Sequence, residues 1–298
     1  MTDGPPVEVV ARSETGRRPA ADAAYAGEPG AFAEDAVLAV FGDVPRTGLP
    51  GFRAVFEAVH DGATRAGIVP IENLVNGTVR EVYDLLLEHD LTIAAEVVVP
   101  VRLCLAALPG ETLEGVERVY SHIQALGQAE GFLRTRPWTL LTTYNTAGAA
   151  KLIAERREAG AAALLSPRAA NRFGLEILAA DVQSVPDNRT RFLVLRRPDE
   201  PSPLSAGEAG GPRRTTLVFA VRNEPGALLA VLTAFAERAI NLSSLESRPS
   251  REGAWEYVFW ADLDGDASEP AMAGALDALA PITTMRRVLG SYPRAADR

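Results

Sequence analysis

The sequence predicts an α/β protein followed by a smaller module of β-α-β-β-α-β order. Up to about residue 197, short apolar runs alternate with amphipathic segments of helical period, which is typical of sheets covered by helices. Residues 198–214 (PDEPSPLSAGEAGGPRR) are rich in Pro, Gly, Ser and charge, so we expect a linker there. Beyond the linker, the order of strand and helix patterns is that of a ferredoxin-like fold.

Composition narrows the class of protein. The 298 residues suggest two domains, and the 47% hydrophobic content is enough for packed cores. A net charge of −9 without a basic stripe argues against a nucleic-acid partner. The single cysteine, Cys104, lies between leucines, so we expect a buried thiol and no disulfide framework. No apolar run suits a membrane span and no His, Asp and Glu spacing suits a metal, so a soluble cytoplasmic protein without metal is expected.

The first part of the chain is expected to alternate strands and helices after a disordered leader, residues 1–20. A glycine turn, GEPGAF (27–32), follows a short strand that ends near Tyr25 and opens a helix. The helices are expected at 34–41, 51–62, 79–88, 146–156 and 167–173, and further strands at 68–69, 91–105, 139–143 and 161–165. Pro100 interrupts the 91–105 run and marks a crossing between lobes.

Two loops carry candidate ligand-binding side chains. Pro70 is expected to end the Ile68-Val69 strand, which places Glu72 and Asn73 in a loop at its C-terminal end, where open α/β sheets bind ligands. In SHIQALGQ (121–128), Ser121 is a candidate helix N-cap, and Gln124 and Gln128 share a helix face. These amides and the hydroxyl line a polar cleft, or they form an ordinary solvated first turn.

The stretch NRTRFLVL (188–195) places polar side chains at the entrance of a buried strand. Thr190 and Arg191 point to opposite sides if the strand has begun there. Asn188, Thr190 and Arg191 together suit a carboxylate-bearing small molecule. The alternative is a turn with a solvated arginine and a threonine that is present for its strand preference.

Read together, these strings resemble the prephenate dehydratase family, which includes the arogenate dehydratases. The matching strings are GEPGAF, VPIEN-x-x-NG-x-V, SH-x-QALGQ, TAGAAKLIA and N-x-TRFLVL, with NEPGALLAVL and LESRP behind the linker. The resemblance implies a periplasmic-binding-protein-like catalytic region of two α/β lobes over 21–197, crossing near 98–102 and 180–186. It also implies that 215–292 form an ACT regulatory domain.

The family reaction converts prephenate to phenylpyruvate with loss of water and carbon dioxide, and it uses no cofactor. The resemblance makes Thr190 the donor to the departing hydroxyl and Glu72 a proton carrier or orienting acceptor. It implies that the substrate is bound by Asn73, Ser121, Gln128, Asn188 and Arg191. A structural ion pair for Arg191 and a loop-capping role for Glu72 stay open. The departures from the family pattern are Ala33, Leu74, Leu103, Ile123 and Asn145.

The ACT resemblance implies phenylalanine as effector, bound by Asn223, Gly226, Ala227, Leu228, Glu246, Ser247 and Arg248. It also implies a homodimer or homotetramer formed through these domains. Three functions remain open at this stage. They are prephenate dehydratase, an arogenate dehydratase or relative that acts on another cyclohexadienyl acid, and a non-catalytic amino-acid sensor.

Overall fold

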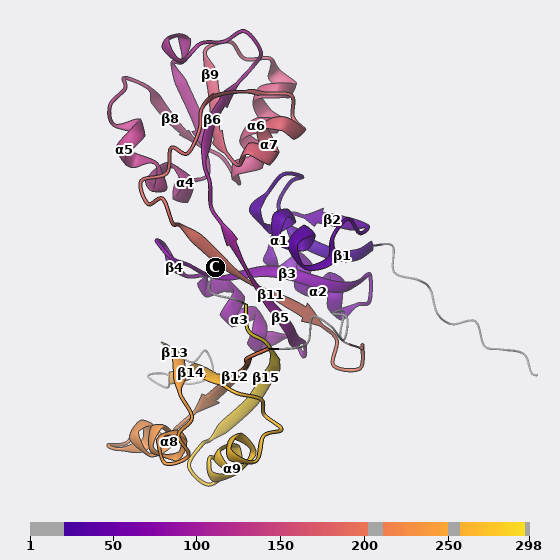
Figure 1. The fold of residues 1–298 in the computed structure, drawn as a ribbon, viewed down its shortest axis with the longest axis vertical. Coiled ribbons are helices and arrows are strands. Elements are labelled where there is room, and N and C mark those ends of the chain that lie inside the picture. Colours follow the sequence, from indigo (N-terminus) through magenta and orange to yellow (C-terminus); the bar gives the residue numbers. More distant parts are fainter. Residues whose placement is uncertain (1–20, 202–210, 250–256, 296–298) are drawn as a thin grey trace, which may run out of the picture.

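A computed structural model describes residues 21–201, 211–249 and 257–295. Three sheets lie one after another along the longest axis of the described part (Figure 1). The central body contains the first sheet, the second lobe lies at one end, and the small C-terminal domain lies at the other end (Figure 1). The mixed α/β architecture and the ferredoxin-like C-terminal domain predicted from the sequence are confirmed.

The first lobe is a mixed sheet with helices on both faces. Its strands are β1 (Ala21–Ala26), β2 (Arg46–Leu49), β3 (Thr64–Asn73), β4 (Gly77–Thr78), β5 (Thr92–Pro100) and β11 (Arg189–Arg196). They run in the order β2-β1-β3-β11-β5, with β4 beside the end of β3. Helix α1 (Phe32–Phe41) packs on one face, and α2 (Phe52–His60) and α3 (Arg80–Glu88) pack on the other.

Strand β3 continues through Pro70, so the expected loop at Glu72 and Asn73 is wrong. Both residues are the last of the strand and pair with Arg191 and Thr190 of β11. On one edge of β3, pairing with β1 stops at Ile68 and pairing with β4 begins at Glu72. Pro70 lies between them, so no partner strand on that edge needs the N–H that proline lacks. On the other edge the ladder shifts register between Arg191 and Phe192, at a bulge.

The second lobe is built from strands β6 (Cys104–Ala107), β7 (Arg118–Ser121), β8 (Thr139–Thr142), β9 (Ala161–Leu165) and β10 (Glu176–Ala179). The order is β10-β6-β9-β7-β8. Helices α6 (Thr146–Arg156) and α7 (Pro167–Arg172) cover one face, and α4 (Ile123–Gln128) and α5 (Glu130–Leu133) cover the other; η1 (Leu113–Gly115) is a short 3-10 turn. The chain enters this lobe after β5 and returns before β11.

Cys104 is fully buried in the second lobe, and burial raises the pKa of its thiol to about 12.

The lobes touch at the Gly30 turn, where Ser166 Oγ donates to the Gly30 carbonyl at 2.7 Å. Gly30 has φ +92°, and a Cβ there would lie 2.6 Å from Ala169 Cα, so the turn requires glycine on both counts. None of the described helices is long and apolar enough to cross a membrane.

The C-terminal domain is an antiparallel sheet with two helices on one face. Its strands are β12 (Arg213–Ala220), β13 (Leu242–Pro249), β14 (Tyr257–Asp264) and β15 (Met285–Pro293), in the order β13-β14-β12-β15. Helices α8 (Ala227–Ala236) and α9 (Pro270–Ala278) pack on one face, where Phe235 of α8 lies in one cluster with Leu217 and Phe219 of β12. Within the described ranges, β13 is an edge strand because it pairs only with β14.

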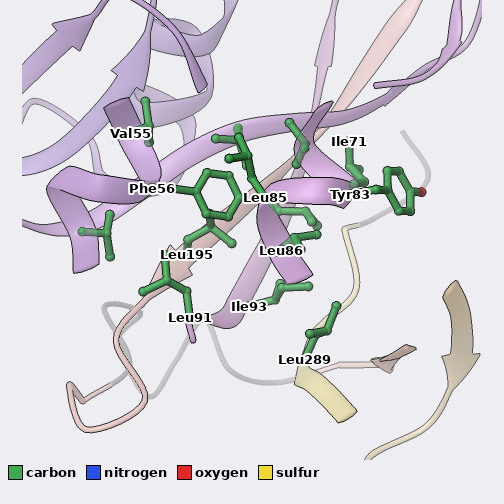
Figure 2. Close-up of a cluster of buried hydrophobic side chains, with 14 of the residues drawn as sticks. Val55, Phe56, Ile71, Tyr83, Leu85, Leu86, Leu91, Ile93, Leu195 and Leu289 are labelled. Atoms are coloured by element: carbon green, nitrogen blue, oxygen red, sulfur yellow. The ribbon is translucent and has the colours of Figure 1, made fainter. Parts of the chain in front are cut away.

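The other face of this sheet packs on the first lobe and shares its hydrophobic core. Leu289 lies beside Ile93 and Leu86 in a cluster that reaches Phe56 and Leu195 (Figure 2). Strands β15 and β5 come so close that a Cβ on Gly290 would lie 2.2 Å from the Ile93 carbonyl oxygen. The C-terminal domain is therefore docked by a continuous core and not only by the linker.

Candidate active site

A cleft of about 560 Å³ lies between the two lobes. The first lobe contributes the end of β3 and the starts of β11, α1, α2 and α3, and the second lobe contributes α4 and the start of α6. Apolar side chains form part of its wall, including Phe32, Phe52, Val79, Val101 and Phe192. The volume and the mixed lining are typical of a site for a small organic molecule.

Asn73 is the centre of the polar network in this cleft, with only 7% of its surface exposed. Its Oδ1 accepts from the backbone N–H groups of Val75 and Asn76, at 3.0 and 2.9 Å. Because backbone N–H groups only donate, these two bonds fix the orientation of the side-chain amide. The amide nitrogen must then face β11, where it donates to the Asn188 Oδ1, the Arg189 carbonyl and the Thr190 Oγ1, at 2.9–3.0 Å.

Thr190 lines the cleft as a hydrogen-bond acceptor from Asn73, at 2.9 Å. An oxygen that accepts from an N–H keeps its own hydrogen available, so the Thr190 hydroxyl can donate into the cleft. The accepted bond also polarises the O–H group, which makes it a stronger donor. The arrangement is a preorganised neutral donor at the start of a rigid central strand.

The second lobe reaches this network through Gln128, whose Nε2 lies 3.4 Å from Asn73 Oδ1. Gln124 and His122 also line the cleft. Ser121 does not line it in the described part of the chain, because it is fully buried in β7 and donates to the Leu164 carbonyl. The expected N-cap role of Ser121 is also wrong, since α4 begins one residue later and His122 is its N-cap.

His122 accepts from the Gln124 backbone N–H through Nδ1, at 3.4 Å. Burial lowers its pKa below the ordinary value for histidine. The imidazole is therefore neutral at pH 7. It lies at the edge of the cleft as a polar group and not as a cation.

Several helices point their N-termini at the cleft. The first residues of α1, α2 and α3 line it, and none of these helices has a side-chain cap. Free backbone N–H groups at a helix N-terminus, together with the helix dipole, favour bound anions. Asn145 caps α6 at the opposite wall, where its Oδ1 accepts from Gly148 N at 2.6 Å.

Arg80 is the single lysine or arginine among the described lining residues, and Glu81 is the single acidic one. No ion pair joins the Arg80 side chain to another described residue. The sequence reasoning missed Arg80, although it directly follows the NG-x-V string at a helix start. Among the departures from the family pattern, Ala33 and Asn145 line the cleft, whereas Leu103 is fully buried and Leu74 and Ile123 are solvent-exposed.

Arg191 and Glu72 lie on the opposite side of the sheet from the cleft. As expected from strand alternation, Arg191 points away from Thr190, and it donates to Asp262 of the C-terminal domain at 2.7 Å. Its Nε lies 3.8 Å from Glu72 Oε2. Burial lowers the pKa of Arg191, but the carboxylates of Asp262 and Glu96 raise it by more, so the pKa stays above its ordinary value. The structure therefore places neither residue beside Thr190 in the cleft.

Asn188 is 1% exposed and accepts from Asn73, so it supports the network from behind. Within the described ranges no group of three or more His, Cys, Asp and Glu side chains could hold a metal ion. The fold and the cleft thus define a two-lobed, small-molecule-binding α/β protein with a docked ferredoxin-like domain.

Comparisons with known proteins identify the family. A sequence profile described as prephenate dehydratase matches residues 23–200, and one described as ACT domain matches residues 215–281. The chain therefore belongs to the prephenate dehydratase family, whose activity is that of a lyase.

Two curated relatives cover most of the chain. A protein named bifunctional chorismate mutase/prephenate dehydratase from Aquifex aeolicus is 38% identical over 276 residues, which is 91% of this chain and 73% of that protein. An Arabidopsis thaliana protein named arogenate dehydratase/prephenate dehydratase 2, chloroplastic, is 38% identical over 279 residues, 91% of this chain and 72% of that protein.

Two solved structures share the whole architecture. Prephenate dehydratase from Arthrobacter aurescens, in complex with L-Phe, superposes with a TM-score of 0.81 at 33% identity and covers 91% of this chain and 90% of that chain. A structure described as GqqA, a novel type of quorum quenching acylase, gives a TM-score of 0.82 at 32% identity and covers 92% of this chain and 98% of that chain.

The predicted effector-binding residues lie at two places in the ACT domain. Gly226, with φ +87°, is the N-cap of α8, and Ala227 and Leu228 begin that helix. Glu246, Ser247 and Arg248 lie on the edge strand β13. Arg248 donates to the Arg80 carbonyl and pairs with Asp84 at 3.3 Å, so its side chain faces α3 of the first lobe.

Proposed function

We propose that this protein converts prephenate to phenylpyruvate, water and carbon dioxide in the cleft between its lobes. The C–C bond to the ring carboxylate breaks, and its electron pair enters the ring. The C–O bond to the ring hydroxyl breaks, and that oxygen leaves as water after it receives a proton. The observation that carries the proposal is the Thr190 hydroxyl, which accepts from Asn73 and keeps its hydrogen for a ligand oxygen.

Thr190 acts by stabilising the charge that develops on the departing oxygen. A threonine hydroxyl is too weak an acid to give up its proton freely, so it donates a hydrogen bond that strengthens as the C–O bond lengthens. A preorganised donor of this kind contributes about 10²–10³ in rate. Asn73 holds Thr190, and Gln128 holds Asn73 from the other lobe.

Arg80 and the uncapped N-termini of α1, α2 and α3 are proposed to bind the carboxylate of the substrate side chain. Charge-assisted hydrogen bonds of this type hold carboxylates firmly. The apolar wall around Phe32, Phe52 and Phe192 would face the ring. We expect the carboxylate that leaves as carbon dioxide to lie against this apolar wall. Strong binding of its charge in the ground state would raise the activation barrier for decarboxylation.

Arogenate is the second candidate substrate, and Glu81 is the observation that favours it. Arogenate carries an ammonium group where prephenate carries a keto group. Glu81 and Arg80 are adjacent at the start of α3, and both line the cleft. An acid beside a cation matches an α-amino acid better than an α-keto acid.

We further propose that phenylalanine is the effector and that it binds at the ACT domain. Support comes from the ACT profile and from the Arthrobacter relative crystallised with L-Phe. The proposed contacts are Asn223, Gly226, Ala227, Leu228, Glu246, Ser247 and Arg248. The edge strand β13 presents backbone groups to which a second copy of the chain can pair, which supports a homodimer or homotetramer through these domains.

Mass spectrometry of products from prephenate and arogenate offered together tests these proposals. Phenylpyruvate from prephenate supports the first substrate, and phenylalanine from arogenate supports the second. Thr190→Val should remove most of the turnover of either one. Folded wild-type protein that consumes neither substrate would refute the proposed reaction.

A further inference from the structure

A cluster of buried charges joins β11 to the ACT sheet, on the side away from the cleft. Arg191 Nη1 donates to Asp262 Oδ2 at 2.7 Å and to Glu96 Oε2 at 3.2 Å. Arg214 of β12 donates to the same Glu96 oxygen at 2.6 Å. The side chains of Glu96, Asp262 and Arg214 keep only 2%, 8% and 9% of their exposure. The cluster is therefore largely buried in the domain interface, beside a small pocket of about 140 Å³.

The two domains contribute to this cluster equally. The first lobe supplies Arg191 and Glu96, and the ACT domain supplies Arg214 and Asp262, so each half is neutral by itself. Separation of the domains thus leaves no net buried charge on either side, but it breaks every short contact between them. The cluster fixes the orientation of the ACT sheet on the first lobe. It does not make the docking irreversible.

Arg191 is bound more tightly to the ACT domain than to its own neighbour on β3. Its distance to Asp262 is 2.7 Å, whereas its distance to Glu72 is 3.8 Å. Thr216 Oγ1 donates to the other oxygen of Asp262 at 2.7 Å, which holds that carboxylate on the ACT sheet. The guanidinium thus bridges Asp262 and Glu96 of its own lobe, and because the Asp262 contact is the shorter one, the guanidinium is expected to follow β14 when the ACT sheet moves.

Thr190 shares a peptide unit with Arg191 and lies on the opposite face of the strand. The register shift beside Arg191 places its extra residue on β3, whereas β11 stays regularly paired with β5 through Thr190, Arg191 and Phe192, so these residues move as one segment of strand. A displacement of Arg191 is thus passed to Thr190 and to its hydrogen bond with Asn73.

We infer that Arg191 is a positioning residue and that its ion pair with Asp262 transmits the position of the ACT sheet to the Thr190 hydroxyl. An effector that shifts the ACT sheet moves Arg191, and Thr190 leaves or regains its productive position. The statement about an effector rests on the proposed function; the mechanical coupling does not. Coupling between the effector site and the cleft needs a physical connection between them, and this cluster is that connection.

The test uses Asp262→Asn in the full-length protein, with Asp264→Asn as the matched control. The first variant removes the charge opposite Arg191 and keeps an oxygen for the Thr216 hydroxyl. Asp264 lies two residues further along β14 and is also ion-paired, at 3.7 Å from Arg294, but no hydrogen bond or ion pair joins it to Arg191. The contact from Arg248 to the Arg80 carbonyl is untouched in both variants.

Hydrogen exchange of ligand-free protein is the first measurement. Amides of residues 188–191 should exchange about ten times faster in Asp262→Asn than in wild type, and at the wild-type rate in Asp264→Asn. The same rate in all three proteins overturns the inference. This comparison needs no substrate and no effector, so it decides the coupling even if the proposed reaction fails.

Kinetics and effector binding are the second measurement. Asp262→Asn should lower kcat for the preferred substrate about tenfold and change KM less than about threefold, because Thr190 acts in the transition state. Phenylalanine should still bind the variant with a Kd within about threefold of wild type. The change in kcat that phenylalanine causes should be at least tenfold smaller in the variant than in wild type. A merely structural role would lower the melting temperature and leave kcat and the phenylalanine response of the folded protein unchanged. That outcome would also overturn the inference.

Discussion

The substitution Asn73→Asp tests the assignment of the hydrogen-bond donor most directly. It keeps the size of the side chain and the oxygen that accepts from Val75 N and Asn76 N. It replaces the amide nitrogen, which donates to Asn188, Arg189 and Thr190, with an oxygen that only accepts. The Thr190 hydroxyl must then donate to the new carboxylate and is lost to the substrate.

The expected loss follows from the bonds removed. Removal of one preorganised donor to a developing charge lowers kcat about 10²–10³-fold, or about 2.7–4 kcal/mol. The repulsion between the Arg189 carbonyl and the new carboxylate costs about 1–3 kcal/mol in folding free energy, whereas the Asn188 amide can turn its nitrogen toward that carboxylate. Burial and the Arg189 carbonyl raise the pKa of the introduced carboxyl above that of an exposed aspartate.

Below that pKa the introduced carboxyl is protonated and offers an O–H to Thr190 again. The rate of the variant relative to wild type should therefore rise as the pH falls. The assay is kcat and KM for the preferred substrate across pH 5–8, with urea denaturation to confirm that the variant is folded. A folded Asn73→Asp variant with kcat within about threefold of wild type at pH 8 would show that Thr190 is not the donor that the reaction uses.

Four further predictions concern the cleft, the buried charges and the buried thiol. Thr190→Ser should keep kcat within about tenfold of wild type, whereas Thr190→Val should lose at least about 100-fold, as measured by steady-state kinetics. Arg80→Gln should raise KM for prephenate about 10–100-fold with little change in kcat. Glu81→Gln should raise KM for arogenate, whereas KM for prephenate should stay unchanged or fall. Glu96→Gln should lower the free energy of unfolding in urea by about 3–5 kcal/mol, because two guanidinium groups lose their shared buried carboxylate. The Cys104 thiol, buried and with its pKa raised to about 12, should react with a thiol reagent only at the rate of unfolding, and fast labelling of native protein would contradict this assignment.

Local patterns were sufficient to predict most of the elements, because alternation and helical period are properties of neighbouring residues. The opposite orientation of Thr190 and Arg191 follows from the strand period alone, and the structure confirms it. The effect of Pro70 depends instead on whether a partner strand needs an N–H at that position. That partner is set by the sheet order, which no local pattern contains.

The partner of Arg191 could not be predicted for a similar reason. Asp262 lies 71 positions further along the chain in another domain, and only docking of that domain brings the two together. The position of Ser121 depended on a single residue of register. A strand that continues one residue longer buries the Ser121 hydroxyl against Leu164 and gives the capping position to His122.

The hinge between the lobes and the proposed catalytic hydroxyl share one hydrogen-bond network. The Val101 N–H, on the chain entering the second lobe, donates to the Asn188 carbonyl on the returning chain at 2.8 Å. The side chain of Asn188 in turn accepts from Asn73, which holds Thr190. Gln128 touches the same Asn73 from the second lobe. Because Gln128 links the second lobe to the network that holds the Thr190 hydroxyl, rotation of one lobe against the other is expected to change the alignment of that donor.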